Sequence, residues 1–233
     1  IRGVNCRDLY SDLSNTKSLP VLPFSDTRLV NILNHTFWFL PSISSCNAMK
    51  NLLMKRANYF YHDYEIIVCA GNAVGTGVDA IKPVRSKMSN PLSSKTITLS
   101  CGKLNTGVTV KPWTGVFFLR DTESPETYFQ TAFRVQSPWQ IPDKDNNSIN
   151  LKEECFIFDF SPNRALKLLT EYSLRLDISD KEHEEKIENV IKFLPILSFD
   201  GSSMKRINAE EVLSISVLGT SGSQLAKKFE SSR

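Results

Sequence analysis

Short apolar runs recur along the chain at intervals that suit an alternating α/β domain. Five of them are apolar on both faces and rich in β-branched or aromatic residues: 37–40, 65–70, 96–100, 115–120 and 155–160. Strands that are apolar on both faces are typical of parallel sheets covered by helices. The pattern predicts an α/β fold, an open, mostly parallel sheet of about five strands with flanking helices.

The segments between these runs carry helix signals. Residues 44–60 place apolar side chains at helical spacing, with Ser44 or Ser45 as the N-cap. Residues 162–176 begin with a Ser-Pro pair, which favours a helix start because proline suits the first helical position. Each segment can therefore serve as a crossover between parallel strands.

The domain boundaries are predicted from where these patterns begin and end. We expect a lead-in segment over 1–25, the α/β domain over 26–176, a helical appendage over 177–218 and a flexible tail over 219–233. The appendage contains two capping boxes, Ser179 with Glu182 and Asn208 with Glu211, each followed by an apolar helical face. The tail is rich in serine and glycine, which favours mobility.

Composition narrows the classes of protein. The 233 residues carry a net charge of only +3, so any contact with nucleic acid must be local. The five cysteines form no CxxC pair, which argues against a zinc site, and their odd number favours a reducing compartment, the cytoplasm. The sequence has no signal peptide and no apolar run long enough to span a bilayer, so no membrane partner is expected.

Two glycine-containing loops follow predicted strands. Residues 71–77 lack the Lys-Ser/Thr of a P-loop and the GxGxxG spacing, so a flexible turn at the end of the strand explains them better than a phosphate site does. Residues 96–112 run from a buried strand into a polar loop with Thr106 and Gly107. Strand carboxyl ends bind ligands in open α/β sheets, and small residues let backbone amides approach phosphate. A tight connection between two strands is the alternative.

A third candidate is the helix predicted over 124–136, with Ser124 as N-cap and Pro125 at the first helical position. Gln130 and Arg134 are four residues apart and share one face of this helix. An arginine on a packed helix is suited to phosphate, because its planar fork matches the phosphate oxygens. A solvated Gln–Arg pair on a surface helix is the alternative.

The order of these features resembles the C-terminal, RecA-like lobe of superfamily 2 helicases. Residues 104–112, LNTGVTVKP, look like the fifth motif, and residues 130–137, QTAFRVQS, look like the sixth, Gln-x-x-Gly-Arg-x-x-Arg. Residues 37–42 resemble the strand of the fourth motif. The segments TLSCGKLNTGVTVKPW and YFQTAFRVQSPW look closest to motors of bacterial restriction-modification enzymes. The resemblance covers roughly residues 30–175.

The resemblance implies a nucleotide site. Arg134 would face the γ-phosphate from the carboxyl-end rim of the sheet, and Gln130 would position nucleotide or the attacking water. Gly107 and Thr109 would contact the nucleotide together with Arg134. The motif departs from the family at Phe133 and Ser137, where the family has glycine and a second arginine, so either Arg134 acts alone or a partner arginine comes from elsewhere.

The resemblance also implies partners. Ser42, Ser44 and Thr106 would hold backbone phosphates of DNA. The sequence contains no GxxxxGK[ST] and no acidic magnesium motif, and it begins with Ile1, so we expect a piece of a longer protein. ATP and Mg²⁺ would be held mainly by the first RecA-like lobe of that parent, with no metal ligand here and no efficient hydrolysis by this chain alone. Other domains of the parent would be further partners.

Three other interpretations stay open. A doubly wound nucleotide- or S-adenosylmethionine-binding domain would use residues 71–77, and a non-enzymatic interaction module would dock through the appendage. A nuclease could use Glu153, Glu154 and Asp159, but the sequence lacks a downstream Glu-x-Lys, and ordinary solvated carboxylates are expected there.

Overall fold

The computed structural model describes residues 23–25, 27–71, 75, 78–102, 104, 108–142, 148–176, 182–199 and 204–218. Contacts divide the chain into two compact units. The first comprises Ile1–Asp121 and Phe129–Phe158, and the second comprises Thr122–Tyr128 and Asp159–Arg233. No helix in the described ranges is long and apolar enough to cross a membrane.

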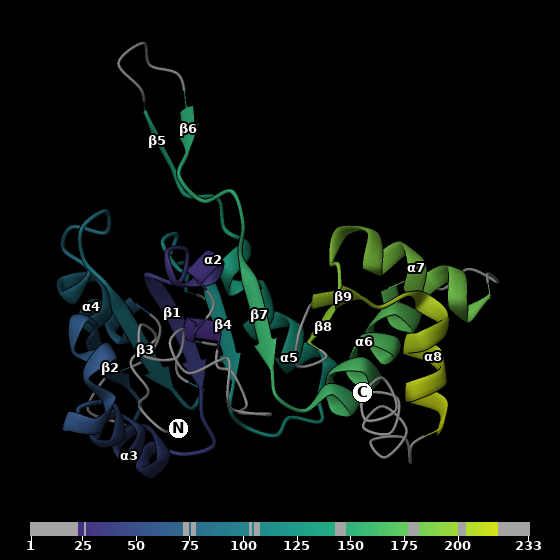
Figure 1. Cartoon of the computed structure of the whole chain (residues 1–233), viewed down its shortest axis with the longest axis horizontal. Helices are drawn as coiled ribbons and strands as arrows, with labels where there is room; N and C mark the ends of the chain where they lie inside the picture. Colours follow the sequence, from purple (N-terminus) through teal and green to yellow (C-terminus); the bar gives the residue numbers. More distant parts are fainter. Residues whose placement is uncertain are drawn as a thin grey trace, which may run out of the picture. The chain divides into compact units, whose positions relative to one another are not determined.

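The first unit is built on a five-stranded sheet (Figure 1). Its strands are β1 (His35–Phe39), β2 (Glu65–Cys69), β3 (Thr96–Ser100), β4 (Gly115–Phe118) and β7 (Phe156–Asp159). They lie in the order β2-β3-β1-β4-β7, and β1 pairs in parallel with both β3 and β4, as β2 does with β3. The five apolar runs are these five strands, so the predicted open, mostly parallel α/β sheet is confirmed.

Two short elements precede β1, η1 (Pro23–Ser25) and α2 (Thr27–Val30). Helices and 3-10 turns connect the strands: α3 (Ile43–Leu53), η2 (Arg56–Asp63), α4 (Val78–Lys87), α5 (Pro125–Ala132) and η4 (Phe133–Gln136). The helix predicted over 44–60 is shorter, because η2 replaces its second half, and its N-cap is Ser42 rather than Ser44 or Ser45. The Ser124 cap is confirmed, with its Oγ accepting from the backbone N–H of Thr127 at 3.2 Å.

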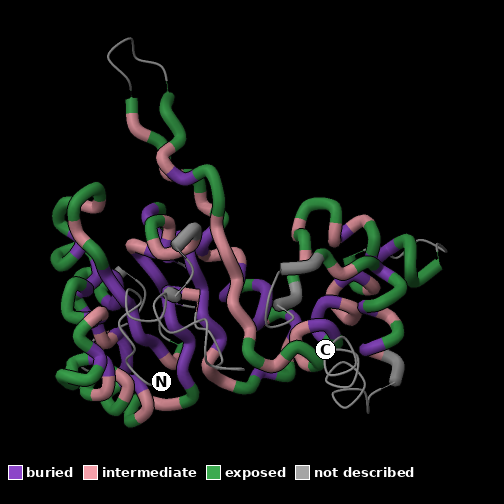
Figure 2. The backbone as a smooth tube through the Cα atoms, in the orientation of Figure 1, coloured by how far each residue is buried: buried purple, intermediate pink, exposed green. Residues whose placement is uncertain are grey.

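Aromatic side chains fill both faces of the sheet. Trp38 and Phe117 are register partners on β1 and β4, and their rings stack 5.1 Å apart. Phe24 stacks on Phe117 from the N-terminal side at 5.4 Å. On the opposite face of β1, Phe37 packs against Trp113 at 4.8 Å. Figure 2 shows buried residues along the inner strands, whereas the described part of β7 is only half-buried.

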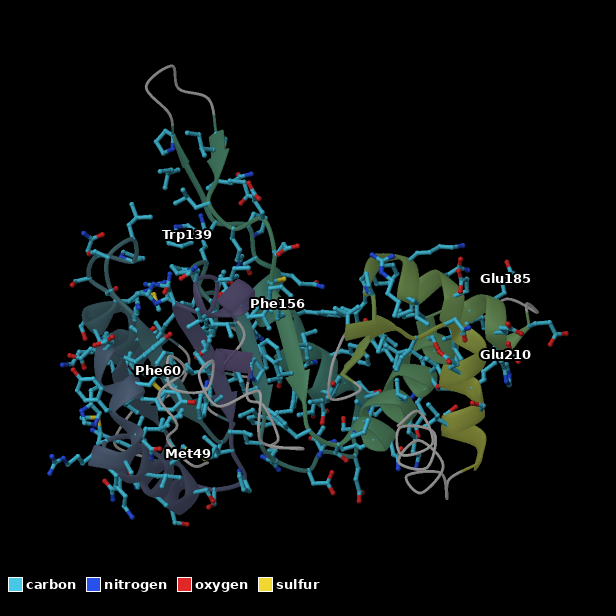
Figure 3. The ribbon with its side chains drawn as sticks, in the orientation of Figure 1. Met49, Phe60, Trp139, Phe156, Glu185 and Glu210 are labelled. Atoms are coloured by element: carbon cyan, nitrogen blue, oxygen red, sulfur yellow. The ribbon has the colours of Figure 1, made fainter. Side chains whose placement is uncertain are left out.

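A hairpin extends from the first unit between η4 and β7 (Figure 1). It consists of β5 (Gln140–Pro142) and β6 (Ser148–Asn150), which pair antiparallel. Trp139 lies at its base and contacts His35, the first residue of β1, with ring centroids 6.4 Å apart. The hairpin therefore leaves the sheet at the end where the parallel strands begin. Figure 3 labels Trp139 at the base of the hairpin.

The second unit contains α6 (Pro162–Leu176), α7 (His183–Phe193), a hairpin of β8 (Leu197–Phe199) and β9 (Met204–Arg206), and α8 (Ala209–Leu218). The three helices pack on one another through side chains that include Leu169, Ile187 and Val212. By its contacts α6 belongs with α7 and α8, so this unit begins before the boundary predicted at residue 177.

The two capping boxes predicted for the appendage have different outcomes. The backbone N–H of Glu211 donates to the Asn208 side chain at 2.8 Å, and the Glu211 carboxylate accepts from the backbone N–H of Asn208 at 3.2 Å, which confirms that box. Glu182 is instead the N-cap residue of α7 and makes no side-chain capping bond. Ser179 and the predicted tail over 219–233 lie outside the described residues.

Candidate functional site

The strand order marks one position on the sheet as a candidate binding site. From β1 the chain passes through α3 to β2, which lies on one side of β1, whereas from β4 it passes through α5 to β7 on the other side. β1 and β4 are neighbours, so their outgoing connections diverge. Open α/β sheets bind ligands where the carboxyl ends of two such strands meet.

The start of α3 lies at the carboxyl end of β1. Ser42 caps α3, and its Oγ accepts from the backbone N–H of Ser45 at 3.1 Å. The same Oγ lies 3.0 Å from the Oγ of Ser44 and 2.8 Å from that of Ser45. Ser42 is half-buried and Ser44 is exposed, so two of the predicted DNA contacts lie together at this rim. The third, Thr106, lies outside the described residues.

Among the described residues at this rim, Arg120 is a cation that sequence reasoning missed. It follows β4 by two positions, and its guanidinium lies over the ring of Phe39, the last residue of β1, at 4.9 Å. Its Nη1 donates to the carbonyl of Cys101, directly after β3, at 3.5 Å, and its Nε donates to the carbonyl of Asp121 at 3.3 Å. The side chain thus reaches from β4 across β1 to β3.

The connection from β3 to β4 passes from the carboxyl end of the sheet back to its amino end. Val108 and Val110 on this segment are buried, and Thr109 between them is exposed. Thr109 is therefore accessible to a ligand. Its contact with nucleotide stays a prediction. Gly107 lies outside the described residues.

Arg134 contacts this connection. Its Nη1 donates to the backbone carbonyl of Val108, so the segments compared with the fifth and sixth motifs meet. The side chain is half-buried, and burial lowers the pKa of its guanidinium. Gln130 is exposed and belongs to α5, whereas Arg134 belongs to the 3-10 turn η4, so the expected single helical face is interrupted between them.

The expected position of Arg134 on the carboxyl-end rim is wrong. α5 begins beyond the carboxyl end of β4, and the chain after η4 arrives at Trp139, which contacts His35 at the amino end of β1. The physical reason is the crossover itself, because a helix joining two parallel strands carries the chain back to their starting end. Arg134 and the rim residues Ser42 and Arg120 therefore belong to different parts of the unit.

Lys152 also contacts the connection from β3 to β4, close to the start of β4. Its Nζ donates to the carbonyls of Lys111 at 2.8 Å and Trp113 at 3.0 Å. The residue is only 8% exposed, and burial lowers the pKa of its amine to about 8. A buried amine with two carbonyl partners stabilises the turn that leads into β4.

Cysteines that are distant in sequence lie close together in the first unit. Cys69 at the end of β2 and Cys101 after β3 both lie near Cys46 on α3, and burial raises the pKa of Cys46 and of Cys69 to about 12. Thiols that stay protonated are poor nucleophiles. Cys46 and Cys69 are therefore ordinary buried thiols, in line with their place in or beside apolar runs.

The acidic cluster near β7 divides in two. Glu153 and Glu154 are exposed, as expected for solvated carboxylates. Asp159 is not solvated: its side chain is 7% exposed, it accepts from Arg164 at 2.6 Å and from the backbone N–H of Ser161 at 2.8 Å, and burial is the main cause that raises its pKa. This pair fixes the turn into α6. Among the described residues, no group of three or more His, Cys, Asp or Glu could hold a metal ion.

Comparisons with known proteins found a relative with a restriction-modification name. No family profile matches the chain. A Mycoplasma pneumoniae (strain ATCC 29342 / M129) protein, provisionally named the C-terminus of the type II restriction enzyme and methyltransferase RM.MpnORF110P, is 33% identical over 178 residues. The match covers 76% of this chain but only 24% of that relative.

Among solved structures, the C-terminal part of the Fun30 ATPase domain aligns with 91% of this chain and 60% of its own, at 11% identity and a TM-score of 0.38. A structural similarity of that size supports no conclusion about this chain. The sequence match thus relates the chain to about a quarter of a protein with a restriction-modification name.

Proposed function

We propose that this chain is the second motor lobe of an ATP-dependent DNA helicase or translocase within a restriction-modification enzyme. Three observations support the proposal: the open parallel sheet, the order of the motif-like segments along it, and the similarity to a protein named for restriction and methylation. The chain spans 24% of that relative, so the activity belongs to a longer parent.

The contact between Arg134 and Val108 is the observation that carries the proposal. Twenty-six residues separate the two positions, yet the arginine of the sixth-motif-like segment is held by a carbonyl of the fifth-motif-like segment. The bond to the carbonyl of Val108 helps to orient the planar fork of the guanidinium, whose shape matches phosphate oxygens. Arginine stays charged even where burial lowers its pKa.

In the proposed reaction, Arg134 stabilises the negative charge that develops on the transferred phosphoryl group of ATP. Gln130, exposed on α5, orients nucleotide or water, and Thr109, also exposed, contacts the nucleotide. Gly107 is proposed as a further nucleotide contact. ATP and Mg²⁺ are held mainly by the first lobe of the parent.

The DNA contacts are proposed for the opposite end of the sheet. Ser42 and Ser44 offer hydroxyl groups at the start of α3, where the helix dipole favours anions. Thr106 is proposed to contribute a further hydroxyl. Contacts of this kind hold the phosphate backbone without reading sequence, as a motor that moves along DNA requires.

The test is Arg134→Ala in the full-length parent protein. We expect kcat for DNA-stimulated ATP hydrolysis to fall on the order of 10³-fold, because the arginine acts on the transition state. The KM for ATP and DNA affinity should change little. Arg85→Ala, which removes an exposed arginine of α4, is the matched control. Circular dichroism checks that both variants are folded, and unchanged hydrolysis in folded Arg134→Ala would contradict the nucleotide role.

A second function has one observation in its favour. Gly71 and Gly75 have positive φ values of 86° and 75° in the turn between β2 and α4, a geometry that suits a cofactor turn. The relative's name also includes a methyltransferase. However, β2 is the edge strand of the sheet, away from the divergent pair β1 and β4. A thermal shift of this chain with S-adenosylmethionine would favour this alternative, because a helicase half-site binds nucleotide weakly by itself.

A further inference from the structure

We propose that Arg120 is the main phosphate contact of the carboxyl-end rim and binds the sugar-phosphate backbone of single-stranded DNA. This inference rests on the proposed motor function and deepens it, because it assigns the cation that Ser42 and Ser44 lack. Hydroxyl groups alone position a phosphate but do not neutralise it, whereas a guanidinium does both.

The position of Arg120 is the first support. Its side chain starts beyond β4, crosses the ring of Phe39 at the end of β1, and reaches the carbonyl of Cys101 beyond β3. These contacts hold the guanidinium over the carboxyl ends of three strands, two of which form the divergent pair. A half-buried cation held there faces the place where open α/β sheets bind their ligands.

The surroundings of the guanidinium are the second support. Gly102 follows Cys101 with a φ of +144°, and a Cβ built on it would meet no atom of the described residues within 4 Å. Gly102 is also exposed, so none of the described side chains covers the backbone beside the Arg120 contact. The first turn of α3 carries no acidic side chain, whereas Asp121, the exposed neighbour of Arg120, is a carboxylate at this rim.

The rim favours a nucleic-acid backbone over a nucleotide. Arg134, the cation of the sixth-motif-like segment, lies on the returning side of the crossover, so we infer that the two arginines serve different ligands. A chain with a net charge of only +3 needs a local cation for salt-dependent binding to DNA. An arginine held over an aromatic ring is also preorganised and loses little side-chain entropy on binding.

The experiment measures binding of fluorescein-labelled single-stranded oligothymidylate to this 233-residue chain by anisotropy, over a series of salt concentrations. We expect Arg120→Ala to weaken binding about 5- to 20-fold and to reduce the slope of log affinity against log salt by about 0.7, the loss of one phosphate contact. Arg120→Lys should restore most of the slope but not all of the affinity, because lysine keeps the charge and loses the fork.

Arg85→Ala is the control, since it removes one exposed arginine of α4 at equal change of net charge. Equal affinities and slopes for Arg120→Ala and Arg85→Ala would overturn the assignment of Arg120 and leave the proposed motor function standing. No salt-dependent binding by the unaltered chain would contradict the proposed DNA contacts as a whole. ATP is the second probe: if Arg120→Ala weakens ATP binding and not oligothymidylate binding, the ligand is a nucleotide phosphate and the DNA assignment is wrong.

Discussion

The two ends of the parallel sheet use polar side chains in different ways. At the amino end, His35, Thr114 and Lys152 are buried and turn their polar atoms to backbone carbonyls, such as that of Pro91, which lies 2.8 Å from the Nε2 of His35. At the carboxyl end, Arg120 is half-buried over an aromatic ring and the serines of α3 reach the surface.

The difference separates two uses of a polar group that look alike in a sequence. A buried donor without a partner costs free energy, so each side chain of the amino-end cluster, His35, Thr114 and Lys152, has a structural partner. The rim groups lie at or near the surface, where water can replace a lost contact. Substitutions should therefore cost stability at the amino end and binding at the carboxyl end.

The largest loss of stability is expected for Lys152→Ala. Two carbonyls would lose their donor, which should lower the free energy of unfolding by about 2–4 kcal/mol. The three tryptophans, Trp38, Trp113 and Trp139, all belong to the first unit, so tryptophan fluorescence in a urea titration follows that unit. Lys87→Ala, which breaks an exposed ion pair with Glu65, should cost at most about 0.5 kcal/mol. Equal losses of unfolding free energy in Lys152→Ala and Lys87→Ala would contradict a structural role of the polar side chains at the amino end.

Thr114→Val is the next test of the amino end. The Thr114 hydroxyl lies 2.5 Å from the carbonyl of Ile32 and 3.2 Å from that of His35, and valine has the same shape without the donor. We expect a loss of about 1–2 kcal/mol in the same urea titration. Thr109→Val, an exposed threonine on the connection before it, should stay within about 0.5 kcal/mol of the unaltered chain.

The amino end should also respond to alkaline pH through Lys152. Burial lowers the pKa of its amine to about 8, below the value of about 10.4 for an unfolded lysine. Between these values the unfolded chain binds more protons than the folded chain, so the free energy of unfolding should rise with pH across this window. Urea titrations of Lys152→Met over the same pH range should lack this contribution, and an identical pH profile in both proteins would refute it.

The smallest effect is expected at the rim. Arg120→Ala removes a half-buried cation whose contacts include a ring and two carbonyls near the surface, where water can replace a lost bond, so the free energy of unfolding should fall by only about 0.5–1 kcal/mol. A loss as large as that of Lys152→Ala would mean that Arg120 is structural, like the amino-end cluster. The urea titration with tryptophan fluorescence decides between these outcomes.

Much of the fold follows from local sequence patterns. The five strands could be predicted because each is a short apolar run between polar segments, and α5 because serine and proline stand at its start. α4 was not predicted, since Pro83 inside it reads as a helix breaker, although Ala80, Ile81 and Val84 have helical spacing and are buried. Neither two-stranded hairpin was predicted, because strands of three residues give too short an alternation to detect.

The site is less predictable, because it depends on contacts between distant segments. Sequence reasoning found Arg134 through a motif, but no pattern indicates that it meets Val108 or that the crossover carries it to the other end of the sheet. Arg120 was missed as a single charge after a strand. Its place there was the available signal, since a cation just beyond a buried parallel strand lies at the rim.

The central place of β1 has a consequence for how the chain folds. It is the first of the described strands in sequence, yet its neighbours are β3 and β4, so Thr36 pairs with Ile97 on one side and Gly115 on the other. During synthesis β1 emerges long before either neighbour. Until they emerge, its phenylalanine and tryptophan side chains have no strand to pack beside and stay exposed to water. Such distant pairings slow folding and leave nascent chains prone to aggregation, so we expect this unit to depend on chaperones until residue 118 has left the ribosome.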